Sequence, residues 1–337
     1  MSLASPLRTL FRATLPLILG LGATCASAEG TLRIAYQFDV GDIVLHVVRD
    51  QKLIEKHGKA DGLDIAVDWR QLSGGSAIND AILSDSIDVA STGLPPLLTI
   101  WDRTRNRQGI RAIAALGSLP VYLLSRNPAV KSLDDLGPSD KIALPATTVS
   151  LHARLLQIAA AQKHGKAQFA RYDAYTVSLP HGEATAALLS GKTEINNHFS
   201  SPPFWFKALK DPAIHKVTGS YDILGGPSTL NILWTTGTFH DKNPRTVAAL
   251  RKALEEGLQR VLRDKKRAAQ IYASLEGSNL PVEEIEAIIS HPDVRYTLQP
   301  QNTLKLAEFL HDVGAIKTRP TSWRDYFFES ALVTEGS

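Results

Sequence analysis

The chain has 337 residues, of which 44% are hydrophobic, 37 are Lys or Arg and 34 are Asp or Glu. This length and apolar content predict about two domains with substantial cores. The nearly balanced charge gives no support to nucleic acid or an anionic lipid surface as the partner.

The first 28 residues have the composition of a secretory signal peptide. Arg8 and Arg12 precede an apolar run at residues 15–21, which is too short to span a membrane, and Ala26-Ser27-Ala28 follows as a small-x-small cleavage signature. We therefore expect cleavage after Ala28 and a periplasmic mature protein that is not an integral membrane protein. The alternative is lipid anchoring at Cys25, but the threonine before that cysteine fits an acylation site poorly.

Cleavage at this position would also remove Cys25, the single cysteine of the chain. The mature protein would then lack disulfides, thiolate catalysis and cysteine metal sites. No Ser-His-Asp arrangement, His-x-x-x-His pair or Walker loop is evident, and the ten histidines have no ligand spacing. The sequence therefore predicts no catalytic residue, no metal site, no cofactor and no enzymatic activity.

Strands and helices alternate in the first part of the mature chain. Alternating and helical apolar patterns predict strands at 32–36, 63–69 and 87–90, a helix at 43–56, and a second helix that opens at 73–76 and runs to residue 83. Such alternation is typical of an α/β lobe with a mainly parallel sheet and helices on both faces.

This unit occurs twice. The segment Ala81–Val89, which leads to Pro95-Pro96, recurs 106 residues later as Ala187–Ile195, which leads to Pro202-Pro203. A repeat of this size is a lobe rather than a solenoid unit. The second copy predicts the same element order: strands at 141–144, 175–179 and 193–196, and helices at 150–163 and 182–189.

Two extended segments connect the predicted lobes. We interpret 119–124 and 230–234 as crossover strands, so that the chain leaves the first lobe and later returns to it. Helical patterns at 247–261 and 304–313 predict a C-terminal cap on the first lobe. The predicted boundaries are 1–28 for the signal peptide, 29–119 with 229–337 for lobe I, and 120–228 for lobe II.

Four predicted helix starts follow strands, at Gln37–Gly41, Ser73–Ser76, Thr147–Ser150 and Pro180–Glu183. Ligands of open α/β sheets lie beyond the carboxyl ends of the strands, where free N–H groups and the helix dipole hold polar or anionic groups. For any single one of these sites, plain N-capping is the better explanation. Two matching starts in each lobe together favour a cleft that binds a small molecule.

The duplicated strands end in equivalent segments, Ser91–Leu94 and Asn197–Ser200. We interpret both as loops that line the cleft. His198 could instead be a buried structural histidine, and the aromatic cluster at Phe199 and 204–206 could be core. The pairing of the two segments favours ligand contact by His198.

A known family is recognisable at these residues. Gly74-Gly75-Ser76, Thr92–Pro96 and Lys131–Leu136 leading to Lys141–Pro145 resemble the nitrate/sulfonate/taurine class of periplasmic ABC-transporter substrate-binding proteins. The resemblance implies a two-lobed type II periplasmic-binding-protein fold with two crossover strands. It implies capture of a small-molecule ligand by a monomer and its delivery to a permease and its ATPase. Leu94 stands where sulfonate-binding members often have an acidic residue, which disfavours an alkyl sulfonate or taurine.

The resemblance and the helix starts together define the predicted ligand contacts. Aromatic and imidazole side chains among them favour a small organic acid or a heteroaromatic compound over bare nitrate. The predicted contacts are Gln37, Phe38, Gly75, Ser76, Thr92, Gly93, Leu94, Thr147, Thr148, Ser150, His198 and Phe199.

Two alternatives stay open. A thiamine-pyrimidine synthase or precursor-binding protein shares the fold, although the synthase family carries a cysteine-rich motif that this chain lacks. A periplasmic sensor domain would bind the same kind of ligand and report to a membrane partner.

Overall fold

The structure is a computed structural model that describes Met1 and residues 29–337 apart from 38 and 73. Residues 2–28 of the predicted signal peptide, Phe38 and Ser73 lie outside the described residues. Within the described part of the chain, none of the helices is long and apolar enough to cross a membrane.

The first sheet has five strands in the order β2-β1-β3-β10-β4. Strand β1 pairs in parallel with β2 and β3, whereas β10 runs antiparallel between β3 and β4. We call this sheet and the helices that flank it lobe I. The strands are β1 (Thr31–Tyr36), β2 (Ala66–Gln71), β3 (Val89–Gly93), β4 (Arg111–Ser118) and β10 (Thr229–Thr235).

The second sheet repeats this plan with the order β7-β6-β8-β5-β9. Strand β6 pairs in parallel with β7 and β8, and β5 runs antiparallel between β8 and β9. This sheet and its helices form lobe II. Both sheets are mixed, because one strand in each, β10 or β5, runs antiparallel to its two neighbours. The strands are β5 (Tyr122–Ser125), β6 (Ile142–Leu144), β7 (Thr176–Ser178), β8 (Asn197–Ser200) and β9 (His215–Gly219).

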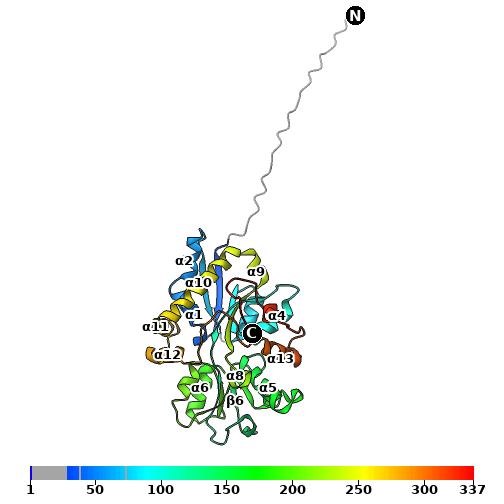
Figure 1. The fold of residues 1–337 in the computed structure, drawn as a ribbon, viewed down its shortest axis with the longest axis vertical. Helices are drawn as coiled ribbons and strands as arrows, with labels where there is room; N and C mark the ends of the chain where they lie inside the picture. Colours follow the sequence, from blue (N-terminus) through cyan, green and yellow to red (C-terminus); the bar gives the residue numbers. More distant parts are fainter. Residues whose placement is uncertain (2–28, 38, 73) are drawn as a thin grey trace.

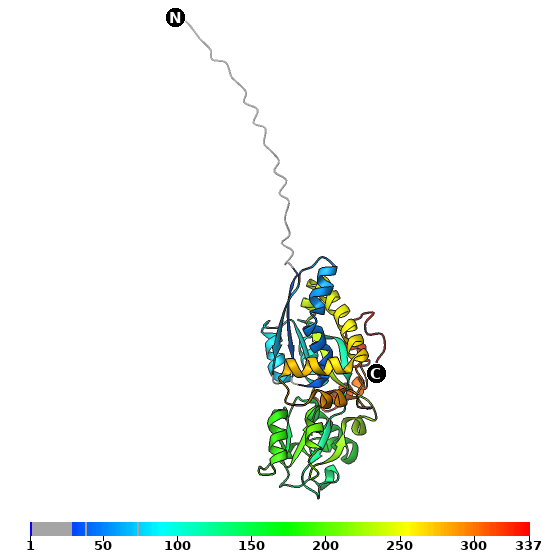
Figure 2. The same ribbon diagram turned by 90° about the vertical axis from the view of Figure 1, so that its left-hand side faces the viewer.

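Helices cover the two sheets, with lobe II drawn in green below lobe I in Figures 1 and 2. The helices that lead into or out of strands of lobe I are α1 (Ile43–Asp50), α2 (Leu53–Ala60), α3 (Gly75–Leu83), α4 (Leu94–Thr104) and α9 (Gly237–Lys242). Those of lobe II are α5 (Leu151–His164), α6 (His181–Ser190), α7 (Phe204–Ala208) and α8 (Ser220–Leu224). The C-terminal helices are α10 (Pro244–Arg263), α11 (Lys265–Glu276), α12 (Val282–Ile289) and α13 (Thr303–Asp312). Short 3-10 helices occupy Val40–Asp42 (η1), Leu133–Asp135 (η2), Lys166–Gln168 (η3), Asp173–Tyr175 (η4) and Trp323–Tyr326 (η5).

Several predicted element boundaries were wrong. The single helix expected at 43–56 is two helices, because Lys52 adopts a left-handed backbone conformation with φ of 48°. The second-lobe strand expected at 193–196 lies at 197–200, and the predicted loops 91–94 and 197–200 are largely strand. Tertiary pairing explains the shift, since β5 provides a hydrogen-bonding partner along all of β8.

The crossovers are also shorter than predicted. Strand β4 ends at Ser118 in lobe I and β5 begins at Tyr122 in lobe II, so that only residues 119–121 link the two strands. The predicted crossover at 230–234 lies wholly within β10 of lobe I. The return passes instead through residues 225–228, between α8 and β10. Apolar extended segments cannot be assigned to a sheet or a crossing without knowledge of their neighbours.

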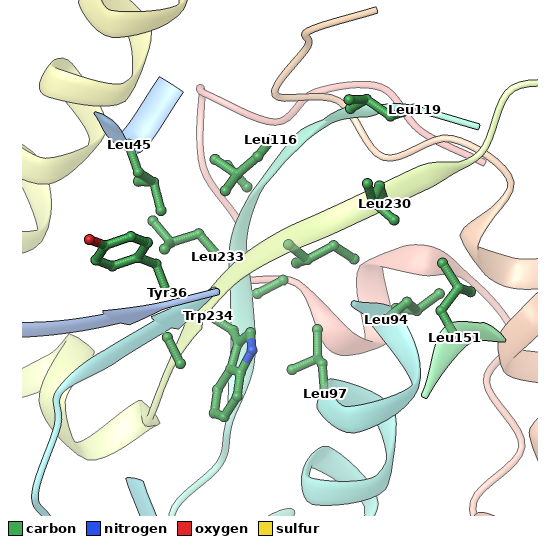
Figure 3. Close-up of a cluster of buried hydrophobic side chains, with 14 of the residues drawn as sticks. Tyr36, Leu45, Leu94, Leu97, Leu116, Leu119, Leu151, Leu230, Leu233 and Trp234 are labelled. Carbon is green, nitrogen blue, oxygen red and sulfur yellow. The ribbon is translucent and has the colours of Figure 1, made fainter. Parts of the chain in front are cut away.

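An apolar cluster joins the lobes beneath the space between them. Figure 3 shows Leu94 of α4, Leu119 of the crossover, Leu151 of α5 and Leu230 of β10. All four are buried in one continuous cluster. A Cβ atom at Gly93 would lie 3.6 Å from Cβ of Leu151, so that the start of α5 closely approaches the end of β3. This packing fixes the neighbouring residues of lobe I and lobe II relative to each other.

The predicted C-terminal cap on lobe I is formed in part by α10, which packs on α1 and α2. Gly257 permits the close approach, because a Cβ atom there would lie 2.7 Å from Cγ2 of Val48. We expect the substitution Gly257→Val to lower the free energy of unfolding by about 1–3 kcal/mol through overpacking. Urea unfolding measures this effect. Gln259→Ala on the exposed side of α10 is the control, and equal stability of both variants would contradict the tight contact.

Candidate functional site

A cavity of about 510 Å³ lies between the lobes. This volume is within the range of small-molecule binding pockets. The lobe I lining is Gln37, Asp39, Leu72, Gly74, Gly75, Gly93, Pro96, Leu230 and Asn231. The lobe II lining is Pro145, Ala146, Val149, Ser150, Leu151, His152, Pro180, His181, Gly182, Glu183, Ser201 and Phe204.

All four helix starts expected at the cleft contribute to this lining. They follow β1, β2, β6 and β7, whose carboxyl ends face the space between the sheets. Parallel strands place their carboxyl ends on the same edge of a sheet, which brings loops distant in sequence together. The residues that they supply are Gln37 and Asp39, Gly74 and Gly75, Val149 and Ser150, and Pro180–Glu183.

Four of the predicted contacts line the cavity: Gln37, Gly75, Gly93 and Ser150. Ser150 also caps α5, because its Oγ accepts a hydrogen bond from the N–H of Ala153 at 3.2 Å. Gly75 is required by packing, since a Cβ atom there would collide with the ring of Pro96 on α4. Structural and ligand-facing roles therefore coincide at Ser150 and Gly75.

The other predicted contacts in the described residues are absent from the cavity lining. Thr92 is buried, and its Oγ1 accepts a hydrogen bond from Nε1 of Trp234 at 3.0 Å. Leu94 and Phe199 belong to the buried apolar cluster. Contact of these side chains with a ligand stays a prediction, as it does for Ser76, Thr147 and Thr148, which lie at the starts of α3 and α5.

His198 is fully buried and contacts another histidine rather than the cavity. Its Nε2 lies 2.9 Å from Nδ1 of His181, which does line the cavity. His152 lies on the other side of His181, with ring centroids 4.9 Å apart, and its Nε2 is 3.0 Å from Oγ of Ser201. We call His152, His181 and His198 the histidine cluster.

Burial favours the neutral form of these three imidazoles. It lowers the pKa of His181 to about 4 and the pKa of His152 and His198 well below their usual range. Neutral imidazoles can each accept one hydrogen bond and donate another. Within the described residues, no group of three or more His, Cys, Asp or Glu side chains has the geometry of a metal site.

A pair of buried carboxylates forms part of the lobe I wall. Asn231 of β10 donates its Nδ2 hydrogens to Oδ1 of Asp39 at 3.0 Å and to Oδ1 of Asp42 at 2.9 Å. Burial, followed by the charge of Asp42, raises the pKa of Asp39 to about 8. Burial likewise raises the pKa of Asp42. Asp39 is the member of the pair that lines the cavity.

Sequence reasoning missed Asp39, Asn231, His152 and His181 as individual site residues. Asp39 and His181 lie inside two of the predicted helix starts but were not singled out. Asn231 offered a signal, since it is a lone amide in the apolar segment Leu230–Trp234. His152 offered none, because nothing in the helical pattern distinguishes it from a core position.

No model of a known protein family and no curated protein matches the sequence. Solved structures do match the fold. The alkanesulfonate-binding protein SsuA from Xanthomonas axonopodis pv. citri, bound to MOPS, has a TM-score of 0.68 and 17% identity over 86% of this chain and 95% of its own. The aliphatic sulphonate binding protein SsuA from Escherichia coli has a TM-score of 0.66 and 18% identity, with 89% and 99% covered.

A third similar structure is the periplasmic nitrate-binding protein NrtA from Synechocystis PCC 6803. Its TM-score is 0.59 at 15% identity, with 77% of this chain and 69% of NrtA covered. All three similarities extend over more than three quarters of this chain. The chain therefore has the two-lobed α/β fold of the type II periplasmic binding proteins.

Proposed function

We propose that the protein is the periplasmic solute-binding component of an ABC importer. It would capture a small polar organic solute between residues 29–119 with 229–337 as lobe I and residues 120–228 as lobe II. The observation that carries this proposal is the cavity, which takes its lining from both lobes and from all four helix starts. The permease and ATPase of the importer are the proposed partners, and the binding protein is proposed to act as a monomer.

The similar structures support binding rather than catalysis, since the proteins named above are binding proteins. The described lining residues form no complete Ser-His-acid triad: Ser150 caps a helix, and Ser201 contacts His152, whose other ring nitrogen has no carboxylate partner. No specific observation favours the pyrimidine synthase or the sensor over the transport role.

Export provides one test of the assignment. We expect the exported form to begin at Glu29, because a signal peptidase would cleave after Ala28. Mass spectrometry of the periplasmic fraction measures this directly. A diacylglyceryl group on Cys25 would show instead that the protein is anchored to a membrane.

Closure of the lobes provides the second test. A ligand that contacts both lobes stabilises the closed state relative to the open one. We expect a solute that raises the melting temperature in a thermal-shift screen also to reduce the radius of gyration in small-angle scattering. Solutes without a thermal shift serve as the control. If no sulfonate, nitrate, carboxylate, pyrimidine or amine produced either effect, the solute-binding assignment would be wrong.

A further inference from the structure

We propose that the cavity selects a small organic cation that presents N–H donors, such as an amidinium or ammonium group, on a planar or apolar body. This inference rests on the proposed solute-binding function and specifies its ligand. The carrying observation is the composition of the cavity wall, which has an acidic side chain on each lobe and no Lys or Arg among its described residues. The similar structures named above bind sulfonates and nitrate, which are anions.

The lining contains acidic side chains and no basic ones. Asp39 on lobe I and Glu183 on lobe II are the carboxylates, and none of the lining residues in the described part of the chain is Lys or Arg. Asp42 places a second carboxylate directly behind Asp39. An anion in this cavity would gain no ion pair with a basic side chain, whereas a cation can pair with Asp39 once this carboxyl group releases its proton.

Asp39 has the geometry of a carboxylate that lacks a cationic partner. Its side chain is only 8% exposed. Oδ1 accepts hydrogen bonds from the N–H of Gly41 at 2.6 Å and from Nδ2 of Asn231 at 3.0 Å, and Oδ2 accepts only a longer bond of 3.2 Å from the same Nδ2. Both donors are neutral, and Oδ2 keeps acceptor capacity. A ligand cation can provide the missing charge and a strong charge-assisted hydrogen bond.

A second, independent observation comes from the opposite lobe. His152 lines the cavity and is 5% exposed, and its Nδ1 has no hydrogen-bond partner in the described structure. Buried polar atoms of this kind normally have a partner. A neutral imidazole nitrogen can accept an N–H, so a ligand donor that reaches Nδ1 would satisfy it. Glu183 is weaker evidence, because a carboxylate in the first turn of α6 also stabilises the helix dipole.

The rest of the lining accommodates the body of such a ligand. Apolar side chains from both lobes surround the polar groups, which favours an aromatic or aliphatic scaffold over a bare inorganic ion. These side chains are Leu72, Pro96 and Leu230 from lobe I, and Pro145, Ala146, Val149, Leu151, Pro180 and Phe204 from lobe II.

Binding of the cation should be linked to a proton. Because burial raises the pKa of Asp39 to about 8, the carboxyl group holds a proton near neutral pH and must release it to pair with the ligand. Affinity for a permanently charged cation should therefore rise with pH through this range. The titratable groups around Asp39 and Asp42 are Tyr36, His46, Tyr272, Glu276 and Tyr296.

Four probes of one shape test the proposal: benzamidinium, benzamide, benzoate and benzenesulfonate. Affinity is measured by calorimetry on the mature protein at pH 6 and pH 8.5, with closure followed by small-angle scattering. We expect benzamidinium to bind at both values, at least about tenfold more tightly at pH 8.5, because at pH 6 the proton on Asp39 must be displaced. Benzamide, benzoate and benzenesulfonate are expected to bind at least about tenfold more weakly than benzamidinium at pH 8.5.

Three substitutions distinguish direct pairing of the ligand with Asp39 from a general electrostatic attraction by acidic side chains. Asp39→Asn should weaken benzamidinium binding at pH 8.5 at least about tenfold and abolish its pH dependence. Glu183→Gln should change affinity by less than about threefold, because Glu183 is exposed. Asp222→Asn, at an exposed site away from the cavity lining, is the matched control and should leave affinity unchanged.

The outcomes distinguish this proposal from the function on which it rests. Closure by benzoate or benzenesulfonate without binding of benzamidinium would overturn the cation assignment and keep the solute-binding function. Unchanged affinity in Asp39→Asn would also overturn it. If neither these probes nor the wider set of solutes bound or closed the lobes, both proposals would be wrong.

Discussion

Replacing His181 by Phe and His198 by Leu together should remove an acid-induced loss of stability of about 2 kcal/mol or more between pH 6.5 and pH 4. Burial lowers the pKa of both imidazoles, to about 4 for His181. Between pH 6.5 and pH 4 the unfolded state therefore binds protons that the folded state does not bind, and stability falls as the pH decreases. At 1.36 kcal/mol per pKa unit, the lowered pKa of His181 corresponds to a loss of about 3 kcal/mol in the free energy of unfolding. The expected loss is smaller, because the ring of His181 keeps some exposure at the cavity wall.

The contact between the rings of His181 and His198 also predicts that stability falls as the pH decreases. A hydrogen bond between Nδ1 of His181 and Nε2 of His198 needs one donor and one acceptor, and protonation of both rings would leave two donors 2.9 Å apart. The phenyl ring at position 181 can keep the stacking on Phe204, whose centroid lies 5.4 Å away.

Urea unfolding at pH 7, 5 and 4 compares the double variant with the parent protein and with His291→Gln, a control on a partly exposed histidine. The quantity of interest is the change in the free energy of unfolding with pH, so that a general loss of stability in the variant does not affect the result. Equal pH dependence in the parent and in the double variant would exclude His181 and His198 as its source.

Asp39→Asn is expected to stabilise the protein by about 2–4 kcal/mol at pH 8.5, although it weakens the proposed ligand binding. The pKa of Asp39 is raised to about 8, mainly by burial. Between the ordinary pKa near 4 and this value the folded state keeps a proton that the unfolded state loses, so the parent protein becomes less stable as the pH rises. An asparagine Oδ1 can still accept from Gly41 and Asn231, and its amide can point into the cavity.

Asp42→Asn is the matched comparison. Both oxygens of Asp42 accept hydrogen bonds, Oδ1 from Ser91 at 2.6 Å and from Asn231, and Oδ2 from the N–H of Gln37 at 3.1 Å. An asparagine there must direct an N–H toward another donor. We expect this variant to be at least about 2 kcal/mol less stable than Asp39→Asn in urea unfolding at the same pH.

The opposite ranking of the two variants would show that Asp39 does not carry the unfavourable buried charge. It would also remove the explanation for proton-linked binding at the cavity. The expected ranking would show that the protein keeps a destabilising carboxylate at its binding site, which is a recognised cost of function.

Much of the fold and part of the site could be predicted from the sequence. Local apolar patterns indicated the order of strands and helices, and the repeat of Ala81–Val89 at Ala187–Ile195 indicated two lobes of one kind. The start of α5 at Ser150 was also predictable, because its N-cap is made by residues three positions apart. These features depend on interactions between neighbours in the chain.

Only the tertiary structure decided which side chains meet at the cavity. Asn231 lies 192 residues from Asp39, and their contact exists because β10 enters the first sheet beside β3. The same kind of long-range pairing made residues 197–200 a strand and left His198 behind His181. Sequence patterns report local periodicity, whereas the register between strands and the depth of a side chain depend on segments that lie far apart in the chain.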